Sequence, residues 1–395
     1  MKLTVGVFFG GVSCEHEISI ISANQAMNAI DRTKYEVIPV YISKSSDFYI
    51  GDKLNDLANF ADLNSLCNSL EKVCLCKDDN KVYLKPVKSG LFVKKAQTID
   101  VAFLVMHGTN GEDGALQGMM EMLNLPYTSS GVLGGAIGQD KAVMKQILSF
   151  EEIPVCPWFS MLAHEFKDKQ EEYLQKSAEM GYPLIIKPAN LGSSIGIEVA
   201  HDRDEFIEKV KECSKYDFKL VVEKLIKDLT EVNISVMGNR YECKTSAIEQ
   251  VLHQGDLLDY QEKYLGGSKS AKGAKMPSKG KLGAKGMASL SRLVPAPIGD
   301  KKTAEIAELA KKTFKALNAN GVVRIDFMID NSCDKVYVNE INTIPGSLAF
   351  YLWSETGMDF TQECDYLIEN ALKVYREKEK KTYSFSTNVL SKFKG

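Results

Sequence analysis

Carboxylate and amide side chains lie at matching positions of two neighbouring segments near the C-terminus, residues 322–330 and 336–343. The first segment alternates apolar and charged residues, and the polar residues between the two segments are typical of a turn. A hairpin of these strands would place Asp326, Glu340 and Asn342 side by side on one face. Three hard oxygen ligands of this kind suit Mg²⁺, which binds a carboxylate or two together with nucleotide phosphates.

A simpler interpretation of such a hairpin is a solvated face, because antiparallel sheets commonly expose one polar face to water. Arg324 shares the face of the candidate metal ligands, and a Pro345–Gly346 turn follows the second strand directly. These neighbours favour a functional site over a solvated surface. The hairpin alone is a weak signal, so the decision depends on the other motifs of the chain.

Two lysines could bind phosphate. Lys187 ends a short apolar strand, and the loop after it, residues 188–197, is rich in glycine and serine. Small residues let backbone N–H groups approach a phosphate, and a lysine adds a point charge. The spacing matches neither a Walker A loop nor a dinucleotide fingerprint, and alone such a loop is more often only a turn. Lys141, at the start of a helix expected over 140–150, is either a second phosphate ligand or an ordinary surface lysine.

The elements that must position these residues begin with alternating strands and helices. In the first third of the chain we expect a helix over 19–30 and strands over 3–9, 36–42 and 101–106. Apolar strands that alternate with amphipathic helices predict an α/β fold with a parallel sheet covered by helices on both faces. Further units are expected to begin near Tyr127 and near Leu220.

The composition is that of a soluble globular enzyme of two or three domains: 395 residues, 44% hydrophobic and 26% charged. A net charge of -3 gives no general attraction to nucleic acid or to an anionic membrane. The apolar runs are strand-sized and no secretion signal is evident, so we expect a cytoplasmic protein. The nine cysteines are scattered without a Cys-x-x-Cys pair, which favours reduced thiols over a zinc site.

Lysine and glycine dominate residues 263–292, a segment without an acidic residue. This is loop composition, and a lid that closes over an anionic ligand is the favoured interpretation. A nucleic-acid arm is the alternative. It is disfavoured because the segment has no aromatic residue other than Tyr264 for stacking on bases.

The motifs resemble, in their order, those of the ATP-grasp enzymes: Lys141, the Lys187 loop with Gly192-Ser193-Ser194, residues 223–226, Arg324-x-Asp326 and residues 339–346. More narrowly, residues 10–19, 107–114 and 127–132 look like those of the D-alanine:D-alanine ligase family, and the likeness covers the chain from about Leu3 to Phe360. The resemblance implies an N-terminal Rossmann-like domain followed by a two-subdomain ATP-grasp fold of α+β character. The expected limits are 1–125, 126–219 and 220–375, with a tail over 376–395.

The resemblance also implies an ATP site. Adenine and ribose would be held by Glu223, Leu225, Ile226 and Glu231. The phosphates would be bound by Lys141, Lys187, Ser194 and Lys263. Asp326, Glu340 and Asn342 would hold two Mg²⁺ ions, with Mn²⁺ as a possible substitute.

For the amino-acid substrates, the resemblance implies that Glu15 pairs with the amino group of the first D-alanine, supported by Ser193 and Tyr264. Arg324 and the N–H of Gly346 would face the oxyanion. The remaining substrate contacts would come from His107, Tyr351 and Leu352. Tyr351 stands where many members place a serine near the second carboxylate. Lys263 and Tyr264 match the dipeptide-forming members, whereas ligases that favour D-lactate tend to carry histidine.

The function implied is an ATP-dependent ligase that joins two D-alanine molecules through an acyl phosphate for cell-wall synthesis. Alternatives are a ligase of the same fold with D-serine or D-lactate as second substrate, and a nucleotide-binding regulatory module without catalysis. The expected partners are D-alanine and ATP, with a second copy of the chain in a homodimer, and neither nucleic acid nor membrane.

Overall fold

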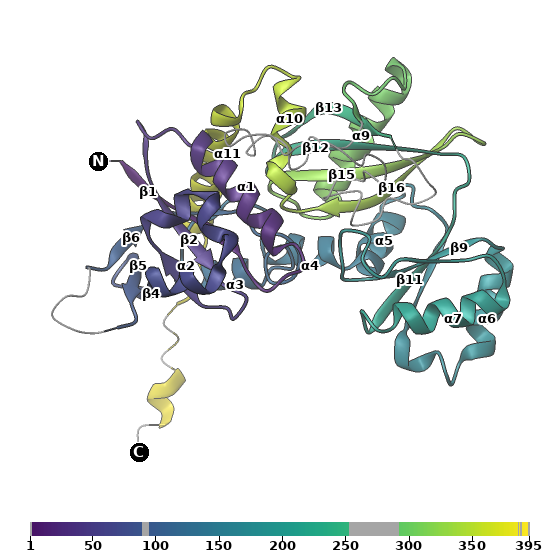
Figure 1. Cartoon of the computed structure of the whole chain (residues 1–395), viewed down its shortest axis with the longest axis horizontal. Coiled ribbons are helices and arrows are strands. Elements are labelled where there is room, and N and C mark those ends of the chain that lie inside the picture. Colours follow the sequence, from purple (N-terminus) through teal and green to yellow (C-terminus); the bar gives the residue numbers. More distant parts are fainter. Residues whose placement is uncertain (1, 89–94, 253–291, 386, 388, 394–395) are drawn as a thin grey trace, which may run out of the picture.

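The computed structural model describes residues 2–88, 95–252, 292–385, 387 and 389–393. Lys263, Tyr264 and the expected lid up to residue 291 therefore lie outside the described residues. The described part contains one sheet near the N-terminus and two further sheets that follow it along the chain (Figure 1).

The N-terminal sheet has a parallel part of three largely buried strands: β1 (Leu3–Gly10), β2 (Tyr35–Ile42) and β7 (Val101–Leu104). β1 pairs in parallel with both of the others. Parallel neighbours need a crossover, and helix α1 (His16–Ala29) provides it between β1 and β2. The predicted α/β character is confirmed, although the helix begins at His16 rather than at residue 19.

The sheet is mixed rather than purely parallel, because the polar stretch before β7 adds antiparallel strands. These are β3 (Phe48–Ile50), β4 (Glu71–Asp78), β5 (Lys81–Pro86) and β6 (Gln97–Ile99). The full strand order is β6-β5-β4-β3-β2-β1-β7. A connection as short as residues 79–80 between β4 and β5 permits only antiparallel pairing. Short helical segments join β3 to β4: Asp52–Asn55, Leu57–Ala61 and α2 (Leu63–Ser69).

The second sheet is antiparallel, in the order β10-β9-β11-β8. Its strands are β8 (Trp158–Leu162), β9 (Leu184–Pro188), β10 (Glu198–Ala200) and β11 (Lys219–Lys224). Helices α6 (Gln170–Met180) and α7 (Arg203–Cys213) pack their apolar residues on it, and a 3₁₀ turn spans Ala163–Glu165. β11 pairs with β8 and β9, so this sheet extends to residue 224 and the next sheet begins at residue 229.

The third sheet has the order β14-β13-β12-β15-β16. Its strands are β12 (Leu229–Gly238), β13 (Cys243–Val251), β14 (Arg292–Leu293), β15 (Gly321–Asp330) and β16 (Lys335–Asn342). Two helices cover it, α9 (Asp300–Ala316) and α5 (Lys141–Phe150). α5 precedes the second sheet in the chain, yet its buried Met144 and Leu148 belong to the core of the third.

The long C-terminal helix returns to the N-terminal sheet, whereas the short helix before it packs on the third sheet. α10 (Phe350–Ser354) follows a 3₁₀ segment over Gly346–Ala349, and α11 (Phe360–Glu379) comes next. Leu367 and Ile368 of α11 share one core cluster with Val5 and Val101, and α11 lies beside α1 (Figure 1). The last described element is a 3₁₀ turn over Val389–Phe393.

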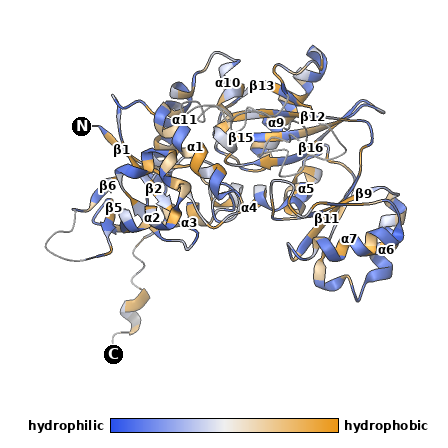
Figure 2. Cartoon of the chain, in the orientation of Figure 1, coloured by the Kyte–Doolittle hydropathy of each residue, from blue (hydrophilic) through white to orange (hydrophobic). Residues whose placement is uncertain are grey.

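The distribution of hydrophilic and hydrophobic residues agrees with the packing of helices on the sheets. Helices α6 and α7 carry both hydrophilic and hydrophobic stretches, as helices that cover one face of a sheet do (Figure 2). Among the helices of the described ranges, none has the length and apolarity needed to cross a bilayer. Helices α3 (Ala115–Leu123) and α4 (Val132–Gln139) connect the N-terminal sheet to α5.

Candidate active site

The C-terminal hairpin forms as predicted. β15 and β16 are antiparallel, with Asp326 opposite Glu340 and Arg324 opposite Asn342. A bulge interrupts the register after Asp326, so that Asn339 has no partner residue on β15. As a result Asn339 and Glu340 are consecutive half-buried residues in a strand that otherwise alternates. The bulge was not predicted, because the sequence spacing of the carboxylates is compatible with a regular ladder.

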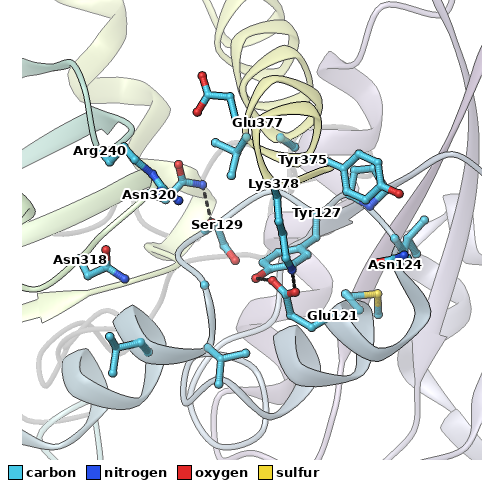
Figure 3. A pocket seen from close by; sticks show the side chains of 18 of the residues that line it. Glu121, Asn124, Tyr127, Ser129, Arg240, Asn318, Asn320, Tyr375, Glu377 and Lys378 are labelled. Atoms are coloured by element: carbon cyan, nitrogen blue, oxygen red, sulfur yellow. Dashed lines mark hydrogen bonds and ion pairs between the residues drawn. The ribbon is translucent and has the colours of Figure 1, made fainter. Parts of the chain in front are cut away.

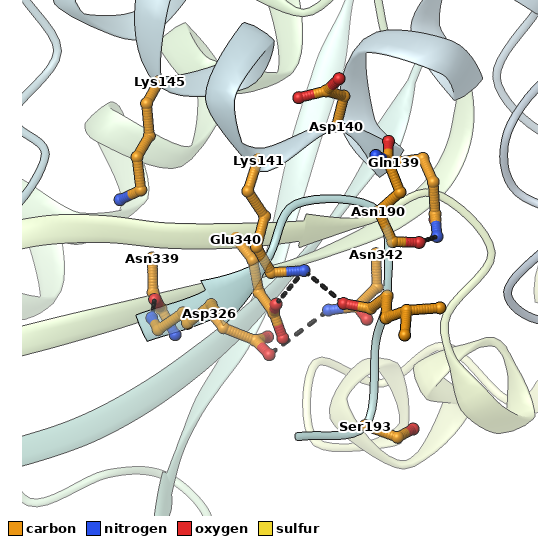
Figure 4. A network of polar contacts seen from close by, with 12 residues as sticks. Gln139, Asp140, Lys141, Lys145, Asn190, Ser193, Asp326, Asn339, Glu340 and Asn342 are labelled. Atoms are coloured by element: carbon orange, nitrogen blue, oxygen red, sulfur yellow. Dashed lines mark hydrogen bonds and ion pairs between the residues drawn. The ribbon is translucent and has the colours of Figure 1, made fainter. Parts of the chain in front are cut away.

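Cations neutralise the two carboxylates of the hairpin. Nε and Nη2 of Arg324 donate to Oδ1 and Oδ2 of Asp326 at 2.6 and 2.7 Å. Nζ of Lys141 lies 3.3 Å from Oε2 of Glu340, and Nδ2 of Asn342 donates to Asp326 at 3.3 Å (Figure 4). Burial opposes the charge of Arg324, but Asp326 outweighs it and raises the pKa of the guanidinium.

The donor set of the hairpin fits Mg²⁺. Asp326, Glu340 and Asn342 offer hard oxygen atoms, and a carboxylate oxygen that accepts one hydrogen bond keeps a further lone pair for a cation. Within the described ranges, no group of three or more His, Cys, Asp or Glu side chains could hold a metal. Two carboxylates and an amide therefore suit an ion that completes its shell with phosphate and water.

The loop after β9 and the start of α5 lie against each other. The N–H of Lys141 donates to the carbonyl of Ala189, and its Nζ donates to the carbonyl of Leu191 at 2.7 Å. Asp140 caps α5 by accepting from the N–H groups of its first turn. Lys141 is therefore a buried residue held toward Glu340 and the loop, and the surface interpretation is wrong. Ser193 and Ser194 both have positive φ, 55° and 58°.

Glu223 and two lysines form a buried ion group. Oε2 of Glu223 lies 3.1 Å from Nζ of Lys187, and Oε1 lies 3.2 Å from Nζ of Lys145. Lys187 also donates to Oδ1 of Asn339 at 3.1 Å. Burial disfavours the charged forms, but the ion pairs outweigh it, so the pKa of Glu223 is lowered and that of Lys187 is raised. Lys145 was not predicted as a site residue, although it follows Lys141 by four positions and therefore lies on the same face of the helix.

A cavity of about 90 Å³ brings together most of the expected ATP residues. It is lined by Lys141, Lys187, Ser194, Glu223, Leu225, Ile226, Glu231, Asp326 and Glu340. Lys224 also lines it and was not predicted; its Nζ donates to the carbonyls of Gly181 and Tyr182. The cavity lies between the second and third sheets, since β9 and β11 form one wall and β12, β15 and β16 form the other.

A second cavity of about 70 Å³ contains the expected amino-acid residues. It is lined by Glu15, His107, Ser193, Arg324, Gly346 and Tyr351, together with Glu231, Asp326, Glu340 and Asn342. Oγ of Ser193 donates to Oε1 of Glu15, which joins the N-terminal domain to the loop after β9. Glu231, Asp326 and Glu340 line both cavities, so the two spaces are adjacent.

Two residues that were expected to contact the substrate, Leu352 and His107, make other contacts in the structure. Leu352 is fully buried, at 0% exposure, and is outside the lining of this cavity, because its turn of α10 faces the core. His107 does line the cavity, but its ring lies between Oγ of Ser22 at 3.0 Å and the carbonyl of Ile344 at 2.9 Å. Burial lowers the pKa of His107, and the contact with the carbonyl of Ile344 joins its ring to the loop after β16.

The sequence missed three charged residues of the substrate cavity. Glu112 accepts from the N–H groups of Gly108 and Ile344 at 2.9 and 2.8 Å, and burial followed by the charge of Glu15 raises its pKa to about 8. Glu249 accepts from Oη of Tyr351 at 2.8 Å and pairs with Arg292 at 3.1 Å. Nothing in the sequence connects β13 to α10, so only the fold brings these groups together.

A separate cavity of about 360 Å³ lies between α3, α11 and residues 318–320 (Figure 3). None of the predicted site residues lines it. Glu121 pairs there with Lys378 and accepts from Oη of Tyr127 at 2.9 Å, and Asn320 donates to the carbonyl of Ser129 at 2.9 Å. The Glu121–Lys378 pair ties the end of α11 to α3, and the Asn320–Ser129 bond ties the residue before β15 to the segment before α4.

The fold and the paired cavities define an ATP-grasp enzyme: two antiparallel sheets enclose lysines and oxygen ligands beside a substrate cavity. Residues 4–130 match the family model described as D-ala D-ala ligase N-terminus, and residues 147–369 match D-ala D-ala ligase C-terminus. The chain therefore belongs to the D-alanine–D-alanine ligase family.

Relatives and solved structures agree with this assignment. The chain is 42% identical over 391 residues to a D-alanine–D-alanine ligase of Thermosipho melanesiensis, covering 98% of each chain. It is 38% identical to that of Thermosipho africanus, again covering 98% of each. Among solved structures it is similar to the D-alanine–D-alanine ligase of Coxiella burnetii, with TM-score 0.77, 27% identity and 96% of each chain covered. It is also similar to the VanG D-Ala:D-Ser ligase of Enterococcus faecalis, with TM-score 0.75, 27% identity and 94% and 100% covered.

Proposed function

We propose that this chain is an ADP-forming ligase that joins two D-alanine molecules to D-alanyl-D-alanine for peptidoglycan synthesis. The observation that carries the proposal is the adjacency of the two cavities, which share Glu231, Asp326 and Glu340. A nucleotide phosphate in the first cavity would be close to a carboxylate in the second. That arrangement suits transfer of a phosphoryl group from ATP to an amino acid.

The first step activates a carboxylate. An oxygen of the first D-alanine attacks the γ-phosphorus of ATP, the bond to the bridging oxygen breaks, and ADP leaves behind an acyl phosphate. Lys141 and Lys187 would bind the phosphate oxygens with Ser194, while Glu223, Leu225, Ile226 and Glu231 hold the nucleoside. Positioning and charge neutralisation provide most of the rate in such transfers.

Asp326, Glu340 and Asn342 would hold two Mg²⁺ ions, which supply charge neutralisation on the phosphates. We expect Glu340→Gln to raise the Mg²⁺ concentration for half-maximal rate by on the order of tenfold or more, because a neutral amide replaces a charged ligand. Titration of activity with Mg²⁺ measures this, with Asp330→Asn at the turn of the same hairpin as control. A Mg²⁺ profile equal to that of the wild type would count against the metal assignment.

The second step forms the peptide bond. The amine of the second D-alanine attacks the acyl carbon, loses a proton, and expels phosphate. Glu15, held by Ser193, would pair with the ammonium group of the first D-alanine. Arg324 and the N–H of Gly346 would stabilise the oxyanion that develops on the carbonyl oxygen. Tyr264 and Lys263, outside the described residues, are expected to complete the site and exclude water.

The second substrate is assigned as D-alanine. Competition among D-alanine, D-serine and D-lactate, with ATP and Mg²⁺, tests this through the mass of the products. A depsipeptide or a D-alanyl-D-serine product in excess would overturn the assignment. ADP release that does not depend on D-alanine would instead favour a regulatory nucleotide-binding module.

We also propose that the enzyme acts in the cytoplasm and that it is a homodimer. Its product, as a component of the cell wall, would help to maintain cell shape. Its partners would be the small molecules ATP and D-alanine, with no nucleic acid. Light scattering of the purified protein tests the dimer, and a monomer at working concentration would refute it.

A further inference from the structure

Lys145 is a charged side chain deep inside the protein. It lies on α5 one turn after Lys141, and it is 0% exposed (Figure 4). Taking an ammonium group out of water costs several kcal/mol unless an opposite charge offsets it. Oε1 of Glu223, itself 1% exposed, is the opposite charge, at 3.2 Å from Nζ of Lys145.

Glu223 serves two cations at once. Its second oxygen, Oε2, lies 3.1 Å from Nζ of Lys187, which also donates to the neutral amide oxygen of Asn339. Two ammonium groups thus share one carboxylate, and the group of three has a formal net charge of one positive unit, with Glu340 the next carboxylate that acts on Lys187. Lys187 and Glu223 line the nucleotide cavity, whereas Lys145 lies behind them and does not.

We propose that Lys145 is a positioning residue for nucleotide phosphate: by sharing Glu223 from behind, it leaves Lys187 with positive charge for the anionic end of the ligand. Without Lys145, Glu223 would neutralise Lys187 alone, and the net charge of the group would fall to zero. Burial lowers the pKa of Lys145, and the carboxylate of Glu223 opposes this shift. The inference rests on the proposed use of ATP, because it concerns how the same cavity binds phosphate.

A purely structural role for Lys145 makes a different prediction. If Lys145 only fills and stabilises the core, its replacement would weaken the binding of every ligand of the cavity alike. A charge role weakens only ligands that carry phosphate. The ratio of the Kd of adenosine to the Kd of ATP therefore separates the two roles, because the nucleoside is common to both ligands.

The test compares this ratio by calorimetry for the whole chain and its variants, with Mg²⁺ held constant. For Lys145→Met we expect the ratio to fall on the order of tenfold, since the ion group that contains Lys187 loses one unit charge. Lys145→Gln provides a second neutral variant if Lys145→Met fails to fold, and Lys145→Arg keeps the charge and should keep the ratio. Lys302→Met is the control for net charge, because it removes a lysine of α9 that pairs with Asp334 outside the cavity.

A double variant sharpens the test. Lys145→Met combined with Glu223→Gln leaves Lys187 as the sole charge of the group, so the ratio should recover toward the wild-type value even if adenosine binds less tightly. An unchanged ratio in both neutral variants would overturn the inference while leaving the proposed function intact. Absence of ATP binding in the wild type would overturn both.

Discussion

Arg324 contacts the candidate metal ligand Asp326 and also lines the cavity proposed for the amino-acid substrates. Its guanidinium donates to both oxygens of Asp326 at 2.6 and 2.7 Å, and it lines the second cavity together with Glu15 and Gly346. A bidentate pair of this kind fixes the plane of the guanidinium. It therefore directs the remaining N–H groups without further adjustment, which is the property that stabilisation of a developing oxyanion requires.

We expect Arg324→Ala to lower turnover by on the order of 10²–10³ while ATP binding persists, the usual effect of removing a preorganised oxyanion donor. Steady-state dipeptide formation and calorimetry with ATP measure the two quantities. Arg203→Ala, which removes a surface arginine paired with Glu171, is the control. If Arg324 only held Asp326 in place, excess Mg²⁺ would restore turnover, and that result would remove it from the chemistry.

Glu112 should make stability depend on pH. Its folded pKa is raised to about 8 by burial and by Glu15, so between the ordinary value of a glutamic acid and about 8 the folded protein holds a proton that the unfolded chain has released. Stability should therefore fall as pH rises through this window, with a slope that approaches about 1.4 kcal/mol per pH unit.

Urea denaturation from pH 5 to pH 8 measures this slope. Glu112→Gln should reduce the slope. It should also lower the free energy of unfolding by a constant amount at every pH, because the NH₂ group of glutamine cannot accept the hydrogen bond from one of the two backbone N–H groups. Glu208→Gln on the outer face of α7, whose side chain is 70% exposed, should leave the slope unchanged. Parallel profiles for the wild type and Glu112→Gln would show that Glu112 is ionised throughout.

At the scale of elements, α4 is placed by its glycines. A Cβ on Gly135 would meet the carbonyl oxygen of Glu112 at 2.8 Å, and one on Gly138 would meet the methyl group of Thr343 at 2.6 Å. The helix therefore lies directly on the strand end that carries Asn342. Since α5 follows after Asp140, the same contact sets the position of Lys141 relative to the hairpin.

We expect Gly135→Ala to destabilise the protein by about 1–3 kcal/mol, because the clash is with backbone and not with a flexible side chain. Gly118→Ala in α3 is the matched control, since a Cβ there would meet its nearest neighbour at 4.0 Å. It should stabilise by about 0.5–1 kcal/mol through helix propensity. Thermal melts of both variants test the pair, and equal shifts would refute the packing argument.

At the scale of the whole molecule, the site exists only where all three parts of the chain meet. Glu15 precedes α1, Ser193 follows β9 and Arg324 lies on β15, yet all three line one cavity. Helix α11 holds the N-terminal sheet in its place, because Ile368 and Leu367 share a core cluster with β1 and β7.

We therefore expect Ile368→Ala, at a fully buried position, to cost about 2–5 kcal/mol of unfolding free energy. Met122→Ala on α3, where the side chain is 88% exposed, should change it by less than about 0.5 kcal/mol. Urea denaturation measures both. A small loss for Ile368→Ala would mean that α11 is not required to hold the sheet.

Sequence patterns are sufficient to predict the parts of the site that are local in the chain. Alternation along residues 322–330 and 336–343 placed Asp326, Glu340 and Asn342 on one face, because side-chain direction in a strand has a period of two. The order of the motifs along the chain was sufficient to predict the family. Most of the residues proposed from the sequence line one of the two cavities, whereas Leu352 lies in the core, and Glu112, Lys224, Glu249 and Arg292 were missed.

The contacts between distant elements could not be predicted, because they depend on the packing of the folded chain. The bulge at Asn339, the sharing of Glu223 by Lys145 and Lys187, and the pairing of Glu249 with Tyr351 and Arg292 depend on how the sheets and helices pack. Burial in the folded core also raises the pKa of Glu112. Such contacts join residues far apart in the sequence, and the free energy of desolvation that governs their charges depends on the whole surrounding core.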